Sequence, residues 1–552
     1  MAVFLPGVLS MVVFYLLILV MGIWASRKSK IEEKKCSGKK SEITMIGGRN
    51  LNIWVSIFTT TATWVGGAFI LGSAEIVYMP NKGLVWATVP FGYSISLTIG
   101  GLFFIKPMRG KNYVTIMDPF QEKYGDTLTG ILLIPSLLAD IFWVASILAG
   151  LGGTMSVILG IPSYYTVVIS AAVAILYTLM GGMYSVAYTD IIQLSFMFLS
   201  LWLSVPFMLT SPASADITFT AVNKLYQEPW LGKVDLQDIL SGVCYQAFYQ
   251  RILAVATDKQ AHITCYISTV FCAFLAIPSL IVDWNQTSFG LPTPYEQDKA
   301  GMILPLSLQH LCPPYVSITG TGAIAAAVMS SIDSAMLSFA SLSARNIYKK
   351  ILRKKASEKE ITYVMKVCIL LIGCTGMGLA MTTSSVYVFW ILSGDIIYTL
   401  MFPQVFCLFF LPDRTNGYGA AMGFGVGLLL RCLMGETTLG IPPVIWLPGS
   451  RLVDGAYEQR FPFRSLIVLV SFAMILLVSH LGSFLFHRGF LPERWDVFKL
   501  RQTGAVTLRD VALKEPNEET NMDTSLPSLP DNEIEDVNTS LCSRPPSQAE
   551  IL

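Results

Sequence analysis

Apolar runs long enough to cross a bilayer recur along the chain from its first residues to about residue 490. A spanning helix needs about 20 mostly apolar residues, because the hydrocarbon core of a membrane is about 30 Å thick. We therefore expect an all-α polytopic membrane protein with about thirteen transmembrane helices. These are expected near residues 4–25, 51–79, 84–106, 127–158, 163–183, 190–210, 239–256, 261–282, 313–342, 361–381, 384–411, 417–434 and 464–487.

The basic loops predict how the chain is oriented. The first run lacks a preceding basic region and ends at Arg27 and Lys28 without a small-x-small cleavage site, so we interpret it as a retained helix. Lysines and arginines cluster at residues 27–40 and again at 345–355. Since such clusters mark cytoplasmic loops, we expect the N-terminus outside the cell and the C-terminus in the cytoplasm.

After residue 490 the composition changes, and the sequence becomes polar, acidic and proline-containing. Such sequence cannot bury enough apolar surface to order itself. We expect a transmembrane domain over residues 1–490 and a disordered, acidic cytoplasmic tail over residues 491–552. Tails of this kind commonly carry signals for the trafficking machinery.

Composition excludes several classes of function. Hydrophobic residues make up 53% of the chain and charged residues 14%, and the mean hydropathy is +0.58. A net charge of +1 gives no reason to expect a nucleic-acid partner, and the four histidines have no paired metal-binding spacing. The ten cysteines form no CxxC pair, and no reactive cluster suggests a membrane enzyme. No span shows a filter-like loop of the kind that channels use.

Two predicted spans are interrupted. The stretch "TTTATWVGGAFILGSAEIVY", residues 59–78, carries two adjacent glycines near its middle, and "ILSGVCYQAFYQRILAVA", residues 239–256, is short and broken. Backbone that leaves a helix inside a membrane is tolerated only where protein or a watery cavity satisfies its polar groups. Secondary transporters use such breaks to bind substrate and ions. The alternative is that the glycines only allow close helix packing.

Two motifs identify a resemblance. "GGMYSVAYTDIIQ", residues 181–193, and "AAVMSSIDSAML", residues 326–337, resemble the sodium/solute symporter family. "TATWVGGAFI", "DWNQTSFGLP" and "ARNIYKK" resemble its choline-transporting branch. The resemblance implies a LeuT-type fold of two inverted five-helix repeats, with one extra helix before and two after. It also implies choline as substrate, sodium as the coupling ion and chloride as a co-ion.

Choline has a quaternary ammonium group without an N–H donor, so a protein must hold it by aromatic faces or a carboxylate. A desolvated cation–aromatic contact contributes about 2 kcal/mol, so several of them suffice for micromolar binding. The resemblance assigns this aromatic cage to five residues: Trp64, Tyr93, Trp143, Tyr245 and Trp390. The family has tryptophan where this chain has Tyr245. The alternative for any single aromatic residue is packing or a place at the membrane interface.

The sodium site is also assigned from the family motifs. Hard oxygen atoms suit such an ion. The assigned ligands are the hydroxyls of Ser330 and Ser331 and the carbonyls of Thr59, Ala62 and Ala327. The alternative for the two serines is a hydrogen bond to the preceding helical turn.

Acids within the membrane are rare, and they mark functional sites by default. Asp333 is expected to tune sodium affinity, and Asp140 and Asp395 are candidates for the transport pathway. Three more charged residues lie near the ends of predicted spans and are interpreted as interfacial: Glu75, Arg431 and Glu436. Glu436 is a candidate for anion dependence.

The chain departs from the family pattern at two spans. Residues 239–256 lack roughly half of a helix, and the span at 261–282 is shortened before Asn285, the expected glycosylation site. Two hypotheses follow: a plasma-membrane choline symporter that supplies acetylcholine synthesis, presynaptic and recycled through endosomes, or a non-transporting choline-binding relative. The sequence does not decide between a monomer and a homo-oligomer.

Overall fold

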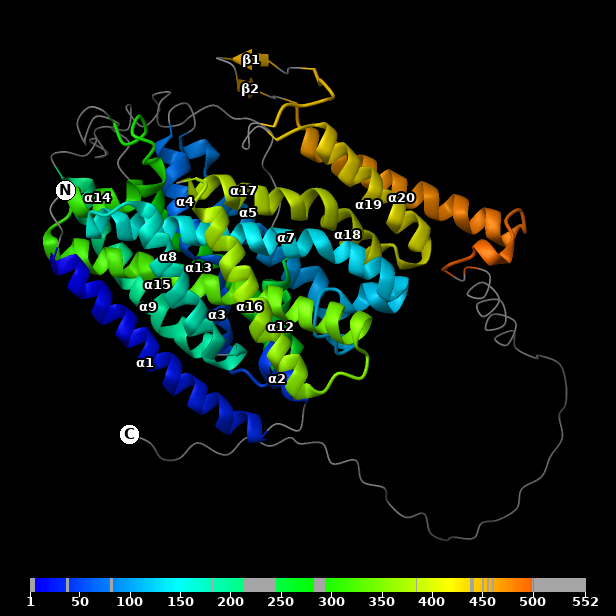
Figure 1. The fold of residues 1–552 in the computed structure, drawn as a ribbon, viewed down its shortest axis with the longest axis horizontal. Helices are drawn as coiled ribbons and strands as arrows, with labels where there is room; N and C mark the ends of the chain where they lie inside the picture. Colours follow the sequence, from blue (N-terminus) through cyan, green and yellow to red (C-terminus); the bar gives the residue numbers. More distant parts are fainter. Residues whose placement is uncertain are drawn as a thin grey trace, which may run out of the picture. The chain divides into compact units, whose positions relative to one another are not determined.

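The computed structural model describes residues 5–35, 39–79, 83–180, 182–211, 245–281, 293–383, 385–436, 441–448, 451–453, 456–458, 461–498 and 500. Apart from one short β-hairpin, β1 (Arg451–Val453) and β2 (Ala456–Glu458), the regular structure in this part of the chain is helical (Figure 1). The all-α prediction for the membrane domain is therefore confirmed in its coarse form. Eight of the described helices are long and apolar enough to cross a membrane, or nine when one bent pair counts as a span.

The first half of the described chain begins with a long helix and contains the bent pair. Its helices are α1 (Leu5–Lys35), α2 (Lys40–Ile46), α3 (Ile53–Trp64), α4 (Gly67–Tyr78), α5 (Thr88–Ile99), α6 (Ile105–Gly110), α7 (Asp118–Leu159), α8 (Ser163–Met180) and α9 (Met183–Thr210). The helix α7 begins nine residues before the predicted span at 127–158. Gly125 has a φ of 81° inside it, so a left-handed residue separates its first turns from the span.

The second half begins with a short helix at the second predicted break. Its helices are α12 (Gln246–Ala254), α13 (Asp258–Leu280), α14 (Ile303–Leu311), α15 (Pro314–Leu342), η7 (Ser343–Leu352), α16 (Glu358–Ala380), α17 (Val386–Ile396), α18 (Phe402–Phe410), α19 (Gly417–Leu433) and α20 (Phe463–His487). The helices α19 and α20 lie side by side (Figure 1).

The two spans that depart from the family pattern differ in the structure. Of the predicted span at 239–256, residues 245–256 are described and include the nine-residue helix α12; residues 212–244 lie outside the described part. The helix α13 has 23 residues, which is enough to cross the membrane. The shortening expected near residue 282 therefore leaves this span intact.

The helix α15 is the centre of the bundle. In its most apolar 18-residue window, 94% of the residues are buried, compared with 28% for α20. It packs against α3, α4, α7, α9 and α16. Small residues between Gly320 and Ala327 let these neighbours approach closely, as is typical of membrane helices.

The Gly66–Gly67 pair explains the break between α3 and α4, which are bent by 42°. A Cβ atom at Gly66 would lie 1.3 Å from Ser331 Oγ, and one at Gly67 would lie 2.4 Å from Val328 Cγ2. The predicted break and the alternative of close helix packing are therefore both correct, because the broken backbone lies directly against α15.

Candidate binding site

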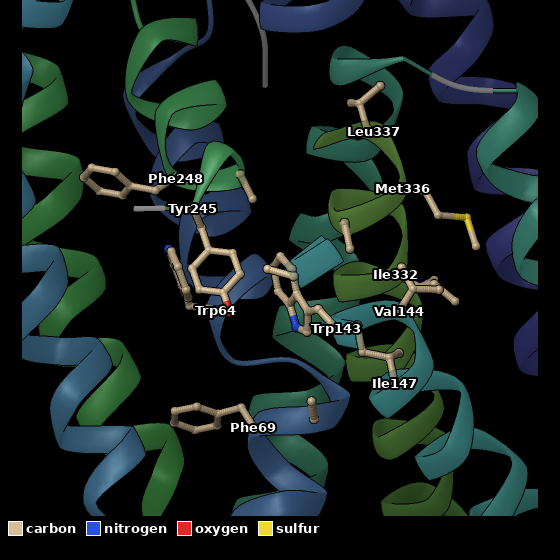
Figure 2. Packing of buried hydrophobic residues seen from close by; sticks show 14 of the residues in the cluster. Trp64, Phe69, Trp143, Val144, Ile147, Tyr245, Phe248, Ile332, Met336 and Leu337 are labelled. Carbon is tan, nitrogen blue, oxygen red and sulfur yellow. The ribbon is translucent and has the colours of Figure 1, made fainter. Parts of the chain in front are cut away.

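Three of the predicted aromatic residues surround the ring of a fourth, Trp64. The centroid of Trp64 lies 4.8 Å from that of Tyr93, 5.8 Å from that of Tyr245 and 6.2 Å from that of Trp143. Trp143 and Tyr245 are themselves 5.4 Å apart. Figure 2 shows Trp64, Trp143 and Tyr245 pointing toward one another from three different helical segments. The structure thus brings together residues that are up to 181 positions apart, from Trp64 to Tyr245.

Trp390 joins this group from α17. Its indole Nε1 donates a hydrogen bond to the hydroxyl of Tyr93 at 2.8 Å, and the two ring centroids are 5.9 Å apart. Phe69 stacks on Tyr93 at 6.0 Å and meets Trp390 edge-on at 6.4 Å. Phe69 is not among the residues predicted from the sequence, although it stands two residues after the glycine pair in the motif "TATWVGGAFI".

The group is closed and almost free of polar atoms. The five predicted aromatic residues are only 3–6% exposed. Tyr245 shares a hydrogen bond with Ser393 Oγ at 2.7 Å, and Ser393 donates to the carbonyl of Ala139 at 2.8 Å. The indole N–H of Trp64 is buried and has no hydrogen-bond partner among the described residues. This aromatic group offers π-faces and one unused donor.

The predicted ion ligands lie next to the aromatic group, where α3 ends. Ser330 Oγ is 3.0 Å from the carbonyl oxygen of Ala62 and 2.9 Å from that of Ala327. Ser331 Oγ is 3.3 Å from the carbonyl oxygen of Thr63. Both serines are 1% exposed. Two hydroxyls of α15 therefore face the last carbonyls of the broken helix, which is a hard oxygen set that suits a sodium ion.

Thr59 lies differently from its prediction. Its carbonyl accepts a hydrogen bond from Thr63 Oγ1 at 2.7 Å, one turn before the break. The carbonyl of Thr63, which sequence analysis did not select, takes the place beside Ser331. The hydroxyl of Thr59 instead donates to Asp190 Oδ2.

A buried polar layer continues from the serines. Arg251 of α12 donates to Ser334 Oγ, and Ser334 donates to the carbonyl of Ser330 at 2.8 Å. Asp333 accepts a hydrogen bond from Thr178 Oγ1 at 2.8 Å. Arg251, Asp333 and Asp190 are 0% exposed. Asp190 and Arg251 are not among the residues predicted from the sequence; the signal for Asp190 is its place in the motif "YTDIIQ".

The remaining acids are partnered by a serine or by arginines, and Asp395 and Glu436 both lie within ion-pair distance of Arg431. Asp140, one turn before Trp143, accepts from Ser338 Oγ of α15 at 2.9 Å. Asp395 forms an ion pair of 2.7 Å with Arg464 of α20. Arg431 pairs with Glu436. Arg431 and Glu436, interpreted as interfacial from the sequence, lie at or just after the C-terminal end of α19 and are largely buried: Glu436 is 4% exposed and the Arg431 side chain 10%.

Glu75, interpreted as interfacial from the sequence, lies one turn before the end of α4 and is 0% exposed, so protein surrounds it rather than water. Its carboxylate accepts from Ser385 Oγ at 2.6 Å and from the backbone N–H groups of Val386 and Tyr387 at 3.0 Å each. A negative charge at a helix N-terminus binds free N–H groups and the positive end of the helix dipole. Glu75 therefore fixes the start of α17, the helix that carries Trp390.

We expect Glu75→Gln to lower the free energy of unfolding by about 1–2 kcal/mol, because the amide loses the charge and turns an N–H group toward other donors. The measurement is the midpoint of thermal unfolding of the purified protein. Ser385→Ala is the comparison variant: it removes one hydrogen bond to Glu75 and also the N-cap hydrogen bond that Ser385 Oγ accepts from the N–H of Val388, so it should lower the midpoint as well. Equal midpoints for wild type and Glu75→Gln would contradict this role.

Two other predictions lie outside the described residues: Asn285, and the tail apart from residues 491–498 and 500. Within the described ranges, no group of three or more His, Cys, Asp or Glu residues is arranged to hold a metal ion. The candidate ion site thus consists of carbonyl and hydroxyl oxygens.

The fold is that of a sodium-coupled membrane symporter. A solved structure of a Na+-coupled sialic acid symporter in its substrate-bound, outward-open state matches with a TM-score of 0.67 at 16% identity. The match covers 86% of this chain and 98% of that chain.

The chain belongs to the Sodium:solute symporter family, whose profile it matches over residues 45–427. It is 46% identical over 517 residues to the human high affinity choline transporter 1, covering 90% of this chain and 89% of that protein. It is 47% identical over 519 residues to the Torpedo marmorata high-affinity choline transporter 1, with the same coverage. The Drosophila melanogaster protein of that name is 40% identical over 511 residues, covering 89% of this chain and 81% of that protein. These relatives are transporters and not enzymes.

Proposed function

We propose that this protein takes up choline into cells by coupling its entry to sodium. The observation that carries the proposal is the buried aromatic group around Trp64. A quaternary ammonium is attracted to aromatic faces by their quadrupoles, and it needs no hydrogen-bond acceptor. The relatives bearing the choline transporter name, similar along most of the chain, support the same substrate.

The aromatic group suits both ends of choline. We expect the trimethylammonium end to bind against the ring faces of Trp64, Trp143 and Tyr245, whose centroids are 5.4–6.2 Å apart and must separate to admit it. The hydroxyl end can accept a hydrogen bond from the unused indole N–H of Trp64. A buried donor without a partner costs about 1–3 kcal/mol, so a ligand that supplies an acceptor recovers that free energy.

Coupling to sodium follows from the chain connectivity. The carbonyls of Ala62 and Thr63 immediately precede Trp64, and all three belong to the end of α3. A sodium ion held between these carbonyls and the hydroxyls of Ser330 and Ser331 would fix the same backbone that positions the indole ring. Binding of one ligand therefore reduces the ordering cost of the other, which is a coupling free energy between two sites.

The proposal extends to several finer points that the family motifs in the sequence imply. It includes a LeuT-type five-plus-five repeat, an outside N-terminus, a cytoplasmic C-terminus and chloride as co-ion. It places the protein in the presynaptic plasma membrane, with recycling through endosomes, where it supplies choline for acetylcholine synthesis. The tail would engage the trafficking machinery, and Asn285 would carry the glycan.

Uptake of labelled choline by cells that express this chain tests the proposal. Surface labelling first establishes that the protein reaches the plasma membrane, and sodium is replaced by lithium or N-methylglucamine in parallel. Saturable uptake that requires sodium supports the symporter. Surface protein that binds choline but does not move it would favour a non-transporting relative.

A smaller effect is expected at Tyr245. Tyr245→Phe keeps the ring but removes the hydrogen bond to Ser393, which is worth about 1 kcal/mol, so we expect a roughly fivefold weaker choline affinity. Ser393→Ala should weaken the affinity at least as much, since it removes the other partner of this bond and also the bond to the carbonyl of Ala139. Measurement of half-saturating choline for the two variants and their double mutant checks this, because the two losses should not add.

A further inference from the structure

Two basic segments that separately indicated the cytoplasmic side converge on one cavity in the structure. The cavity has a volume of about 310 Å³. It lies among α2, the first turns of α7 and η7. It is lined by Lys39, Glu42, Asp126, Arg345, Lys349, Lys350 and Lys354. Five of these side chains are cationic and two are acidic.

The strongest ion pairs lie at the inner wall of the cavity. Lys350 Nζ is 2.7 Å from Asp118 Oδ1, and Arg345 lies 3.3 Å from carboxylate oxygens of both Asp118 and Glu42. The Asp118 side chain is only 5% exposed. These contacts hold α2, α7 and η7 together and leave little charge unsatisfied there.

The rim is different, because its lysines have weak partners or none. Lys354 pairs with Asp126 at 2.9 Å and Lys349 with Glu358 at 3.3 Å, and both carboxylate side chains are 35% exposed. Exposed pairs of this kind contribute about 0–1 kcal/mol, so they are readily exchanged for a better anion. Lys39 forms no ion pair with any described residue.

We propose that this cavity binds a phosphomonoester anion, either the headgroup of a phosphoinositide lipid or a free phosphate compound. A phosphate group carries a charge of about −1.5 to −2 and three acceptor oxygens, so it can replace two weak carboxylate partners at once. Basic pockets at the cytoplasmic ends of membrane helices bind such headgroups. The rim lysines Lys39, Lys349 and Lys354 supply the contacts, and the inner pairs keep the cavity open.

Binding would connect elements that carry the transport site. The segment η7 continues α15, which bears Ser330 and Ser331, and α7 bears Trp143. An anion bridging Lys39 to the lysines of η7 would join α2 to the end of α15. The bound protein should therefore unfold at a higher temperature.

The test uses the purified full-length protein in detergent micelles and three probes. These are dioctanoyl phosphatidylinositol 4,5-bisphosphate, inositol 1,4,5-trisphosphate and inorganic phosphate, each titrated while binding and the thermal midpoint are measured. The double variant Lys349→Gln/Lys354→Gln removes two rim charges, and Lys355→Gln/Lys359→Gln is its matched control. Lys355 and Lys359 are exposed in the same segment but do not line the cavity.

We expect the rim variant to bind the phosphoinositide at least about tenfold more weakly, while the control binds as wild type does. Tight binding of the lipid with much weaker binding of the two soluble probes identifies a membrane headgroup. Comparable binding of inositol trisphosphate identifies a free phosphate ligand. The proposal is overturned if no probe binds, or if both double variants weaken binding equally.

Discussion

Replacing Trp64 by alanine is expected to weaken choline binding about thirtyfold, which corresponds to about 2 kcal/mol for one desolvated cation–aromatic contact. Trp64 should show the largest effect of the five predicted aromatic residues because its ring alone contacts Tyr93, Trp143 and Tyr245. Trp64→Phe should lose much less, since a benzene ring still presents a face. The measurement is the equilibrium binding of labelled choline to the purified variants.

Loss of packing must be separated from loss of the cation–aromatic contact, because removal of a buried tryptophan costs about 3–5 kcal/mol in stability. Trp64→Leu fills more of the space than alanine does but has no aromatic face. The neutral compound 3,3-dimethyl-1-butanol has the shape of choline without its charge. Wild type should prefer choline to this compound, and Trp64→Leu should lose most of that preference. An unchanged preference would remove the cage interpretation at this position.

The second large effect is expected on sodium dependence. Ser330→Ala should raise the sodium concentration for half-maximal uptake about tenfold, because an interaction between a hydroxyl and a charged group contributes about 1.5–3 kcal/mol. The Ser330 side chain lies between the carbonyls of Ala62 and Ala327. Among the described residues, no other side-chain oxygen lies within hydrogen-bond distance of these two carbonyls. Sodium titration of uptake at saturating choline measures the change.

Ser317→Ala is the matched control for Ser330→Ala. Ser317 is on the same helix and is 2% exposed, but it lies 13 residues before Ser330. This variant should keep the sodium curve of wild type. If both serine variants shift the curve equally, the effect belongs to the helix as a whole and Ser330 is not a ligand.

Periodicity and motifs predicted the helical membrane domain and the residues of the aromatic group, but they did not predict the polar contacts between helices. Glu75 illustrates the difference. Its sequence position at the end of a span suits an interfacial acid, and only the approach of α17, some 310 residues later, buries it. A spacing rule reports on neighbours along one helix, whereas this carboxylate is satisfied by a different helix.

The ion site shows the same limit at a finer scale. The motif located the end of α3 and the paired serines of α15. It did not decide whether the carbonyl of Thr59 or that of Thr63 faces Ser331. That choice depends on where the helix stops, and the stop is set by contact between Gly66 and α15 rather than by local propensity.

The ion pair between Asp395 and Arg464 has a consequence for shortened products of the gene. Asp395 belongs to α17, the helix that bears Trp390, whereas Arg464 begins α20 almost 70 residues later. A buried charge that loses its partner costs about 3–5 kcal/mol. A premature stop codon between Asp395 and Arg431 would therefore leave an uncompensated carboxylate beside the binding helix, because Arg431, which lies 3.9 Å from Asp395, would be lost together with Arg464. Such a product would be a substrate for quality control in the endoplasmic reticulum rather than a shorter working transporter.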